Sequence, residues 1–522
     1  MIELESYLQG KWVRGRDGAK SATLVNPSTE EPMAKASTEG LDFDGALTYA
    51  RNVGGPGLRA MTFAQRGEML RALSRAIHAN RDELFGMAIA NGGNTRSDAK
   101  FDIDGASLTL AAYADLAPTL GDGPALVDGD DIQLGRTPRL FGRHVFVPRH
   151  GAAVHVNAFN FPAWGMAEKA AVALLAGMPV VSKPATSTAL VAWRFAKIMV
   201  DAGVLPEGAF QFIAGSTGDL LDHVTGQDVL AFTGSSNTGA TLRTSKGVVA
   251  ASVRVNVEAD SLNAAVMGPD VEDGSDLMGL FLGDVVRDLQ QKTGQKCTAI
   301  RRVYVPRERL ASIVEQLKDR LSAIKVGDPS REEVTMGPVA TAQQQRDVSA
   351  LLATFAKHGR FVMGGGERGT VLGVPEGKGF FVAPSLLVCE SPAPGDAIHT
   401  HEIFGPSVTV MPYDGTPANA AALVAAGGGG LVSSVYSYDK AFVQGCVLGI
   451  APFHGRVTIG SSKIVGQAIP PGTVMAQLVH GGPGRAGAGE ELGGRRGLAF
   501  YMQRAALQGD RALLDAITGK RD

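Results

Sequence analysis

Short apolar runs alternate with helical patterns through the middle of the chain. The apolar runs are GAAVHVNAF, MPVVSKP, FQFIAG, VLAFTG and ASVRVNVEA, which begin at residues 151, 178, 210, 229 and 251. Between them, helical patterns are expected over 167–176, 187–202, 218–224 and 238–246. Strands that alternate with helices predict right-handed crossovers and a parallel sheet covered by helices on both faces.

The carboxyl ends of these predicted strands are the expected place for a ligand, because open α/β sheets bind their ligands there. Asn160, Lys183, Gly234 and Glu258 each fall just after a predicted strand. We therefore expect these four side chains to converge on one edge of the sheet.

Further elements are expected on either side of this region. Helices are predicted over 62–87 and 282–291, where apolar residues recur at helical spacing. The α/β pattern resumes near Leu262 and continues through the second half of the chain. Segments 131–136 and 143–149 predict a β-hairpin, because Val alternates there with polar or aromatic neighbours.

Composition and charge narrow the class of protein. The 522 residues are 44% hydrophobic, enough to bury two or three cores. The net charge of -2 gives no general basic field that would gather nucleic acid or an anionic membrane. The N-terminus lacks the apolar core of a signal peptide, and no apolar stretch reaches the roughly 18 residues of a membrane span. We expect a cytoplasmic globular protein.

The three cysteines, Cys297, Cys389 and Cys446, lie far apart and form no CxxC pair, which argues against a disulfide framework. Cys297 follows a Gly-containing bend in TGQKCT, after the helical run that ends at 291. Nearby backbone N–H groups are expected to favour its thiolate and lower its pKa. Taken alone, this pattern is more often that of a packed, inert cysteine.

Six motifs in a fixed order reverse that interpretation. They are VNAFNFP, SKPAT, FTGSSNTG, VEADSLN, TGQKCT and HEIFGP, which begin at residues 156, 182, 232, 257, 293 and 401. In this order and spacing they resemble the aldehyde dehydrogenase superfamily over nearly the whole chain. The resemblance implies an α/β fold with a Rossmann-like cofactor domain, a second α/β catalytic domain and a small β oligomerisation element.

The resemblance also implies how the chain is divided. The expected parts are a cofactor-binding domain of residues 1–130 and 150–261, a catalytic domain of residues 262–480, and oligomerisation elements of residues 131–149 and 497–522. Elements of this kind imply a homodimer or a dimer of dimers.

Three residues match the family's catalytic positions. Cys297 would attack an aldehyde carbonyl, and loss of hydride to a nicotinamide would leave a thioester. The Asn160 amide and the backbone N–H of Cys297 would hold the developing oxyanion. Glu258 would be the general base for water, with a pKa raised by a partly desolvated cleft. Relatives that pass the acyl group to coenzyme A usually lack this Glu, so its presence implies a free carboxylic acid product.

Other positions match the family's cofactor site. Gly234 and Ser235 open a helix after a strand, where exposed N–H groups favour a pyrophosphate. Glu402 would bind the nicotinamide ribose hydroxyls, and Phe404 would pack against that end of the cofactor. For all four positions a purely structural role is the alternative.

Lys183 and Thr186 bear on the choice of cofactor. Relatives that prefer NAD usually have Glu where this chain has Thr186, and a carboxylate there repels a 2′-phosphate. Threonine removes the repulsion, and Lys183 can pair with the phosphate. We therefore expect NADP in preference to NAD.

Two features bear on the substrate: departures from the family's usual residues, and the C-terminal segment 480–509. Gly-Gly after the base Glu is replaced by Ala259-Asp260, and the aromatic residue before GQxC by Gln290 or Gln291, which predicts an unusual pocket. Residues 480–509 resemble a narrower branch of the family that oxidises CoA-linked semialdehydes in aromatic catabolism, including benzoate degradation. Arg485, Arg495 and Arg496 could contact CoA phosphates there, or be solvated.

Alternatives stay open. A CoA-free semialdehyde or a simple aldehyde is the second choice of substrate, and a non-catalytic binding protein on this fold is the alternative class. His399 and His401 lack further spaced ligands, so no metal site is expected. The glycines at 427–430 lack the Lys-Ser/Thr of a P-loop, which argues against nucleotide hydrolysis.

Overall fold

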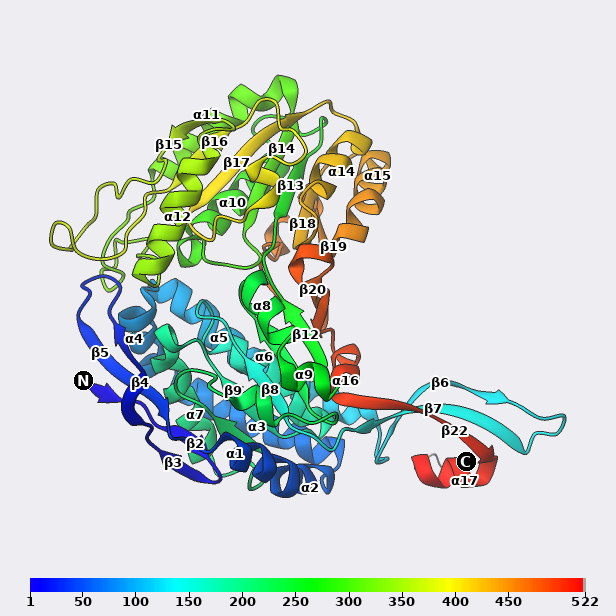
Figure 1. The fold of residues 1–522 in the computed structure, drawn as a ribbon. Helices are drawn as coiled ribbons and strands as arrows, with labels where there is room; N and C mark the ends of the chain where they lie inside the picture. The colour runs from blue at the N-terminus through cyan, green and yellow to red at the C-terminus, as the bar shows by residue number, and fades with distance from the viewer. Residues whose placement is uncertain (520–522) are drawn as a thin grey trace.

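The computed structural model describes residues 1–519, and its first sheet confirms the parallel arrangement expected for residues 151–259 (Figure 1). Five parallel strands form its centre in the order β12-β11-β8-β9-β10. Their bounds are Ala153–Val156 for β8, Val180–Lys183 for β9, Phe210–Phe212 for β10, Val229–Thr233 for β11 and Arg254–Glu258 for β12. An antiparallel hairpin, β2 (Ser6–Leu8) and β3 (Lys11–Val13), extends the sheet beyond β10 and was not expected.

Helices cover this sheet and pack into one large hydrophobic core. Their bounds are Phe63–Ala79 for α3, Arg81–Gly92 for α4, Arg96–Leu116 for α5, Trp164–Ala176 for α6 and Ala189–Asp201 for α7. The alanine-rich α6 is buried along almost its whole length, because its small side chains allow close approach to α5 and the sheet. The N-terminal part adds β1 (Ile2–Glu3), β4 (Arg16–Val25), β5 (Pro32–Glu39), α1 (Phe43–Tyr49) and α2 (Gly55–Arg59).

Three predicted helices are interrupted or shorter than expected. The helix predicted over 62–87 is broken at Asn80, whose side-chain amide donates to the Ala76 carbonyl (2.8 Å). The helix predicted over 238–246 is two helices, α8 (Ser236–Arg243) and α9 (Lys246–Ala250). Only a 3₁₀ turn at Leu220–His223 stands where 218–224 was expected to be helical.

The second sheet confirms that the chain repeats its α/β character after Leu262. Its seven strands follow the order β15-β16-β17-β14-β13-β18-β19. The strands are β13 (Asn263–Met267), β14 (Ile300–Pro306), β15 (Arg360–Met363), β16 (Ser385–Val388), β17 (Ser407–Tyr413), β18 (Gly430–Tyr436) and β19 (His454–Gly460). The helices are α10 (Asp276–Gln290), α11 (Leu310–Ser322), α12 (Ala342–Phe355), α13 (Ala397–Thr400), α14 (Pro417–Ala425) and α15 (Lys440–Ile450).

A three-stranded sheet projects from the body of the molecule (Figure 1). It consists of β6 (Leu126–Gln133), β7 (Leu140–Pro148) and β22 (Met502–Asp510), followed by α17 (Arg511–Thr518). The predicted hairpin is therefore present, although β6 begins before residue 131, and the C-terminal segment pairs antiparallel with β7. Residues 520–522 of the expected 497–522 element lie outside the described residues.

A small hairpin joins the two α/β parts. Strands β20 (Val479–Gly482) and β21 (Gly489–Leu492) pair antiparallel and lead into α16 (Arg495–Tyr501). β20 packs beside β18 and β19 of the second sheet, whereas β21 packs against β12 and α6 of the first. Over residues 1–519, none of the helices has the length and apolar character that crossing a membrane requires.

Candidate active site

The residues expected at one sheet edge do lie there. Lys183 and Glu258 are the last residues of β9 and β12, and Gly234 directly follows β11. The strands end in register, since Val156 pairs with Lys183 and Thr233 pairs with Glu258. The carboxyl edge of the first sheet therefore faces the second α/β part, which carries Cys297.

Cys297 sits on a turn with unusual backbone geometry. After α10 ends, Lys292, Thr293 and Gly294 have φ values of 52°, 56° and 68° in succession. This left-handed region is costly for residues with a side chain. A Cβ on Gly294 would lie 2.1 Å from the Gly405 carbonyl oxygen, so only glycine fits there.

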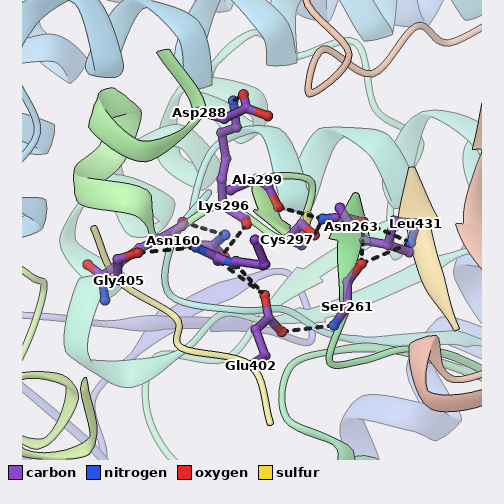
Figure 2. Close-up of polar contacts among 12 residues, drawn as sticks. Asn160, Ser261, Asn263, Asp288, Lys296, Cys297, Ala299, Glu402, Gly405 and Leu431 are labelled. Carbon is purple, nitrogen blue, oxygen red and sulfur yellow. Dashed lines mark hydrogen bonds and ion pairs between the residues drawn. The ribbon is translucent and has the colours of Figure 1, made fainter. Parts of the chain in front are cut away.

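Two side chains that the sequence analysis missed hold this turn in place (Figure 2). The Asn263 amide donates to the carbonyls of Cys297 (2.8 Å) and Ala299 (2.9 Å). The Arg301 guanidinium donates to the carbonyls of Lys296 (3.1 Å) and Gly405 (3.2 Å). These bonds fix the backbone around the nucleophile. Asn263 is the last residue of the VEADSLN motif, but its position there did not indicate which backbone carbonyls it would bind.

Cys297, Glu258 and His480 form a compact group at the junction of the two parts. Their sulfur, carboxylate oxygen and imidazole nitrogen lie within 4.8 Å of one another. His480 Nε2 is 3.0 Å from Glu258 Oε2, and both side chains are buried. The contact is an ion pair when the imidazole is protonated, and its geometry is not that of a well-aligned hydrogen bond. His480, on β20, was not predicted; it was visible only as part of the tail motif.

The ionisation of this group differs from both expectations. Burial raises the pKa of the Cys297 thiol well above its usual value, and the Glu258 carboxylate adds to the effect. Burial would also raise the pKa of Glu258, but its contacts with His480, Lys169 and Cys297 together outweigh burial and lower that pKa. The expected low-pKa thiolate and raised-pKa glutamic acid were therefore wrong, because the sequence did not show the Cys297–Glu258–His480 contact. The site holds a protonated thiol beside an ionised carboxylate.

A buried charge cluster lies behind Glu258. Lys169 donates to Glu168 (2.7 Å), Thr233 (2.7 Å) and Glu491 (3.0 Å). Carboxylate oxygens of Glu168, Glu258 and Glu491 lie within 4.8 Å of one another. One lysine thus offsets several buried carboxylates, which explains why these charges are tolerated. No spacing pattern along the chain indicated that residues so far apart would meet.

Asn160 lies next to the Cys297 turn. Its side-chain amide donates to the Gln295 carbonyl (3.0 Å) and is buried. A primary amide has two N–H bonds, so a second donor is left for an oxyanion. The oxyanion role of Asn160 stays a prediction.

The expected pyrophosphate site has an extra carboxylate. Gly234 N donates to the Glu258 carbonyl (3.1 Å), and Ser235 caps the start of α8 by accepting from Thr238 N (3.3 Å). Asp260 accepts from Ser236 N (3.1 Å), so it takes one of the N–H groups that a phosphate would use. The two glycines expected after the base would leave that group free.

Lys183 ends β9, and Thr186 follows it three positions later in the chain. Burial lowers the pKa of Lys183 to about 8, and Thr186 begins a short 3₁₀ turn. A half-buried ammonium at the edge of the sheet is a good partner for a phosphate, which would restore the charged form. These residues and the exposed start of α8 fit a dinucleotide.

Glu402 and Phe404 also lie near the nucleophile, in the loop after α13. Glu402 accepts from Ser261 N (2.8 Å) and Arg301 Nε (3.1 Å), and burial raises its pKa to about 7 (Figure 2). Phe404 packs edge-on against Phe159, with ring centroids 5.8 Å apart. Both carboxylate oxygens of Glu402 already accept hydrogen bonds, so they would have to exchange these donors for ribose hydroxyls. The role of Glu402 in binding the nicotinamide ribose stays a prediction.

A cavity of about 690 Å³ reaches Cys297 from the surface. Its walls are mainly apolar, with Phe101, Leu108, Phe161, Trp164 and Val474 among the lining residues. Gln291, at one of the positions expected to change the pocket, lines it and accepts from Lys296 Nζ (2.7 Å). A pocket of this size and lining suits an elongated apolar chain that ends at the sulfur.

Comparison with known proteins agrees with this geometry. The aldehyde dehydrogenase family model matches residues 12–507. The 3,4-dehydroadipyl-CoA semialdehyde dehydrogenase of Aromatoleum evansii is 41% identical over 482 residues, which cover 92% of this chain and 93% of that protein.

Solved structures show the same fold. A betaine aldehyde dehydrogenase variant from Staphylococcus aureus in complex with NAD+ is similar with a TM-score of 0.84 and 22% identity, covering 98% of both chains. A 3,6-anhydro-L-galactose dehydrogenase solved with NADP gives a TM-score of 0.82 and 21% identity, covering 97% of this chain and 100% of that one. The chain belongs to the aldehyde dehydrogenase family of oxidoreductases.

Proposed function

We propose that this enzyme uses NADP to oxidise a CoA-linked semialdehyde to the carboxylic acid, with 3,4-dehydroadipyl-CoA semialdehyde as the first candidate. The observation that carries the proposal is the Cys297–Glu258–His480 group at the end of an apolar cavity. A nucleophile, a base and a hydrophobic approach are the parts that aldehyde oxidation through a thioester needs.

The site supports a sequence of proton movements. Ionised Glu258 accepts the Cys297 thiol proton as the sulfur attacks the aldehyde carbon. The free N–H of Asn160 and the backbone N–H of Cys297 stabilise the oxyanion. A bound nicotinamide supplies the hydride acceptor, and the oxidised carbon remains as a thioester on Cys297. Glu258 releases that proton to solvent before the second half of the reaction. It then accepts a proton from the water that hydrolyses the thioester and passes it to the departing sulfur, which releases the acid and the free thiol.

The substrate assignment rests on the relative and on the cavity. The Aromatoleum evansii protein is named for a CoA-linked semialdehyde, and the identity covers nearly all of both chains. The apolar cavity accommodates a carbon chain, whereas a polar group such as CoA would remain outside it. A CoA-free semialdehyde or simple aldehyde is the second candidate, because the apolar walls do not themselves require CoA.

An activity assay with a matched variant tests the function. The wild-type enzyme is expected to reduce NADP+ with CoA-linked and free semialdehydes and to release the acid. Cys297→Ala should lower kcat by at least about 10³-fold while it still binds NADP. Cys446→Ala, which removes a buried thiol in the second α/β part, is the control and should stay active. Equal activity of Cys297→Ala and wild type would disprove the proposed nucleophile.

The cofactor preference is tested at Thr186. Thr186→Glu places a carboxylate near Lys183, where it repels a 2′-phosphate and can bind ribose hydroxyls. We expect kcat/KM for NADP to fall about tenfold relative to that for NAD. Thr186→Gln has the same size without the charge and should change this ratio much less. A wild-type preference for NAD would overturn the proposal of NADP.

The proposed assembly is a homodimer or a dimer of dimers. The projecting sheet of β6, β7 and β22 leaves Ile132, Leu134 and Leu140 exposed, and such an arm buries little of itself in one subunit. Sedimentation velocity measures the oligomeric state directly.

The cytoplasm is the proposed location, because a free catalytic thiol needs a reducing compartment.

A further inference from the structure

A second pocket adjoins the aldehyde cavity on the catalytic side. Its volume is about 350 Å³, and it lies between the start of α5 and the helices α10 and α11. Ser97 and Gln291 line both this pocket and the aldehyde cavity, so the two lie next to each other. A substrate whose aldehyde reaches Cys297 would have its other end directed toward the second pocket.

The second pocket is polar and presents positive charge. Arg287 on α10 and Arg320 on α11 both line it and are exposed. Among the described residues, the one carboxylate that pairs with Arg287 is that of Asp284, at a long distance of 3.7 Å. Within residues 1–519, no carboxylate forms an ion pair with Arg320. The two guanidinium groups are thus available to an anion.

The acidic lining residue does not cancel this charge. Asp98 is buried and accepts from Thr95 Oγ1 (2.7 Å) and Lys292 N (3.0 Å), so both oxygens face the protein. Burial raises the pKa of Asp98, which favours its neutral form. Arginines in the tail are less suited, because Arg485 donates to the Thr400 carbonyl (2.7 Å) and Arg495 to the Val127 carbonyl.

We propose that this second pocket binds the phosphate groups of the CoA part of the substrate, with Arg287 and Arg320 as the binding residues. The inference rests on the proposed CoA-linked substrate and identifies where its handle is held. Guanidinium groups match phosphate oxygens by paired hydrogen bonds, and two arginines on neighbouring helices suit a ligand with several phosphates. The bound handle directs the aldehyde end along the apolar cavity to Cys297.

Kinetics with two substrates test the pocket. The double variant Arg287→Ala/Arg320→Ala should lower the ratio of kcat/KM for the CoA-linked semialdehyde to kcat/KM for hexanal by about tenfold. The loss should lie in KM for the CoA-linked substrate and not in kcat. Lys318→Ala removes a cation on the same helix α11 outside the pocket, and should leave the ratio unchanged. An unchanged ratio in the double variant would overturn the inference.

Direct binding separates this inference from the proposed function. Calorimetry should show that CoA binds the wild-type enzyme and binds the double variant about tenfold more weakly. Weaker binding of dephospho-CoA would assign the pocket to the 3′-phosphate, and equal binding would assign it to the diphosphate. If CoA binds both proteins equally, or neither, the inference is wrong while hexanal oxidation still supports the enzyme. If the wild type oxidises no aldehyde, the proposed function itself fails.

Discussion

Glu258 shows how one neighbour decides the chemistry of a buried residue. The carboxylate is surrounded by protein, and burial by itself would raise its pKa. The imidazole of His480, 3.0 Å away, is the largest of the influences that lower the pKa instead. An ionised carboxylate is in the form that can accept the thiol proton, which Cys297, with its raised pKa, gives up as the sulfur attacks. Activation of the thiol is therefore shared between Glu258 and His480.

The pH dependence of catalysis tests this arrangement. His480→Gln removes the largest of the influences that oppose burial, so the pKa of Glu258 should rise. Because Glu258 must be ionised to act, the acidic limb of the kcat profile should move to higher pH, by about one unit or more. His358→Gln removes a histidine ion pair with Asp396 elsewhere and is the control. An unmoved acidic limb in His480→Gln would contradict this role.

At the scale of elements, the turn between α10 and β14 positions the nucleophile. Three consecutive left-handed residues make it a strained connection. The strain is balanced by the side-chain bonds of Asn263 and Arg301 to four backbone carbonyls. These hydrogen bonds keep the turn in its left-handed conformation. Cys297 is thereby held in one position, although it belongs to no helix or strand.

A glycine substitution measures the contribution of this turn. Gly294→Ala introduces a Cβ 2.1 Å from the Gly405 carbonyl oxygen at a φ of +68°. The turn must shift, so we expect lower stability by about 3 kcal/mol and a large loss of kcat. Gly274→Ala is matched, since its φ is +73° but nothing lies within 4 Å. It should cost only about 1 kcal/mol and keep its kcat. Thermal midpoints and kcat are measured for both variants. Gly274→Ala reports the cost of the positive φ alone, and the further loss in Gly294→Ala reports the steric clash.

At the scale of the whole molecule, periodicity predicted the parallel first sheet, the residues at its carboxyl edge and the return of the α/β pattern after Leu262. Strand and helix patterns are local, so Lys183, Gly234 and Glu258 could be placed by counting along the chain. The contacts that set their ionisation are not local. His480 and Glu491 reach the site from more than two hundred positions away, and no periodicity connects residues at such separations. The break at Asn80 was missed for a different reason, since one side-chain bond outweighed a continuous apolar pattern.

The hairpin of β20 and β21 ties the two α/β parts together mechanically. Ala486 accepts from Ala259 N (3.0 Å) on the first part, and Arg485 N donates to the Gly428 carbonyl (3.1 Å) on the second. The same hairpin carries His480 and Glu491, which flank Glu258 and its lysine partner. A hinge rotation between the two α/β parts would displace this hairpin. His480 and Glu491 would then move relative to Glu258. The hairpin of residues 479–492 therefore makes the electric field at the reacting atoms depend on the two α/β parts staying in their present arrangement.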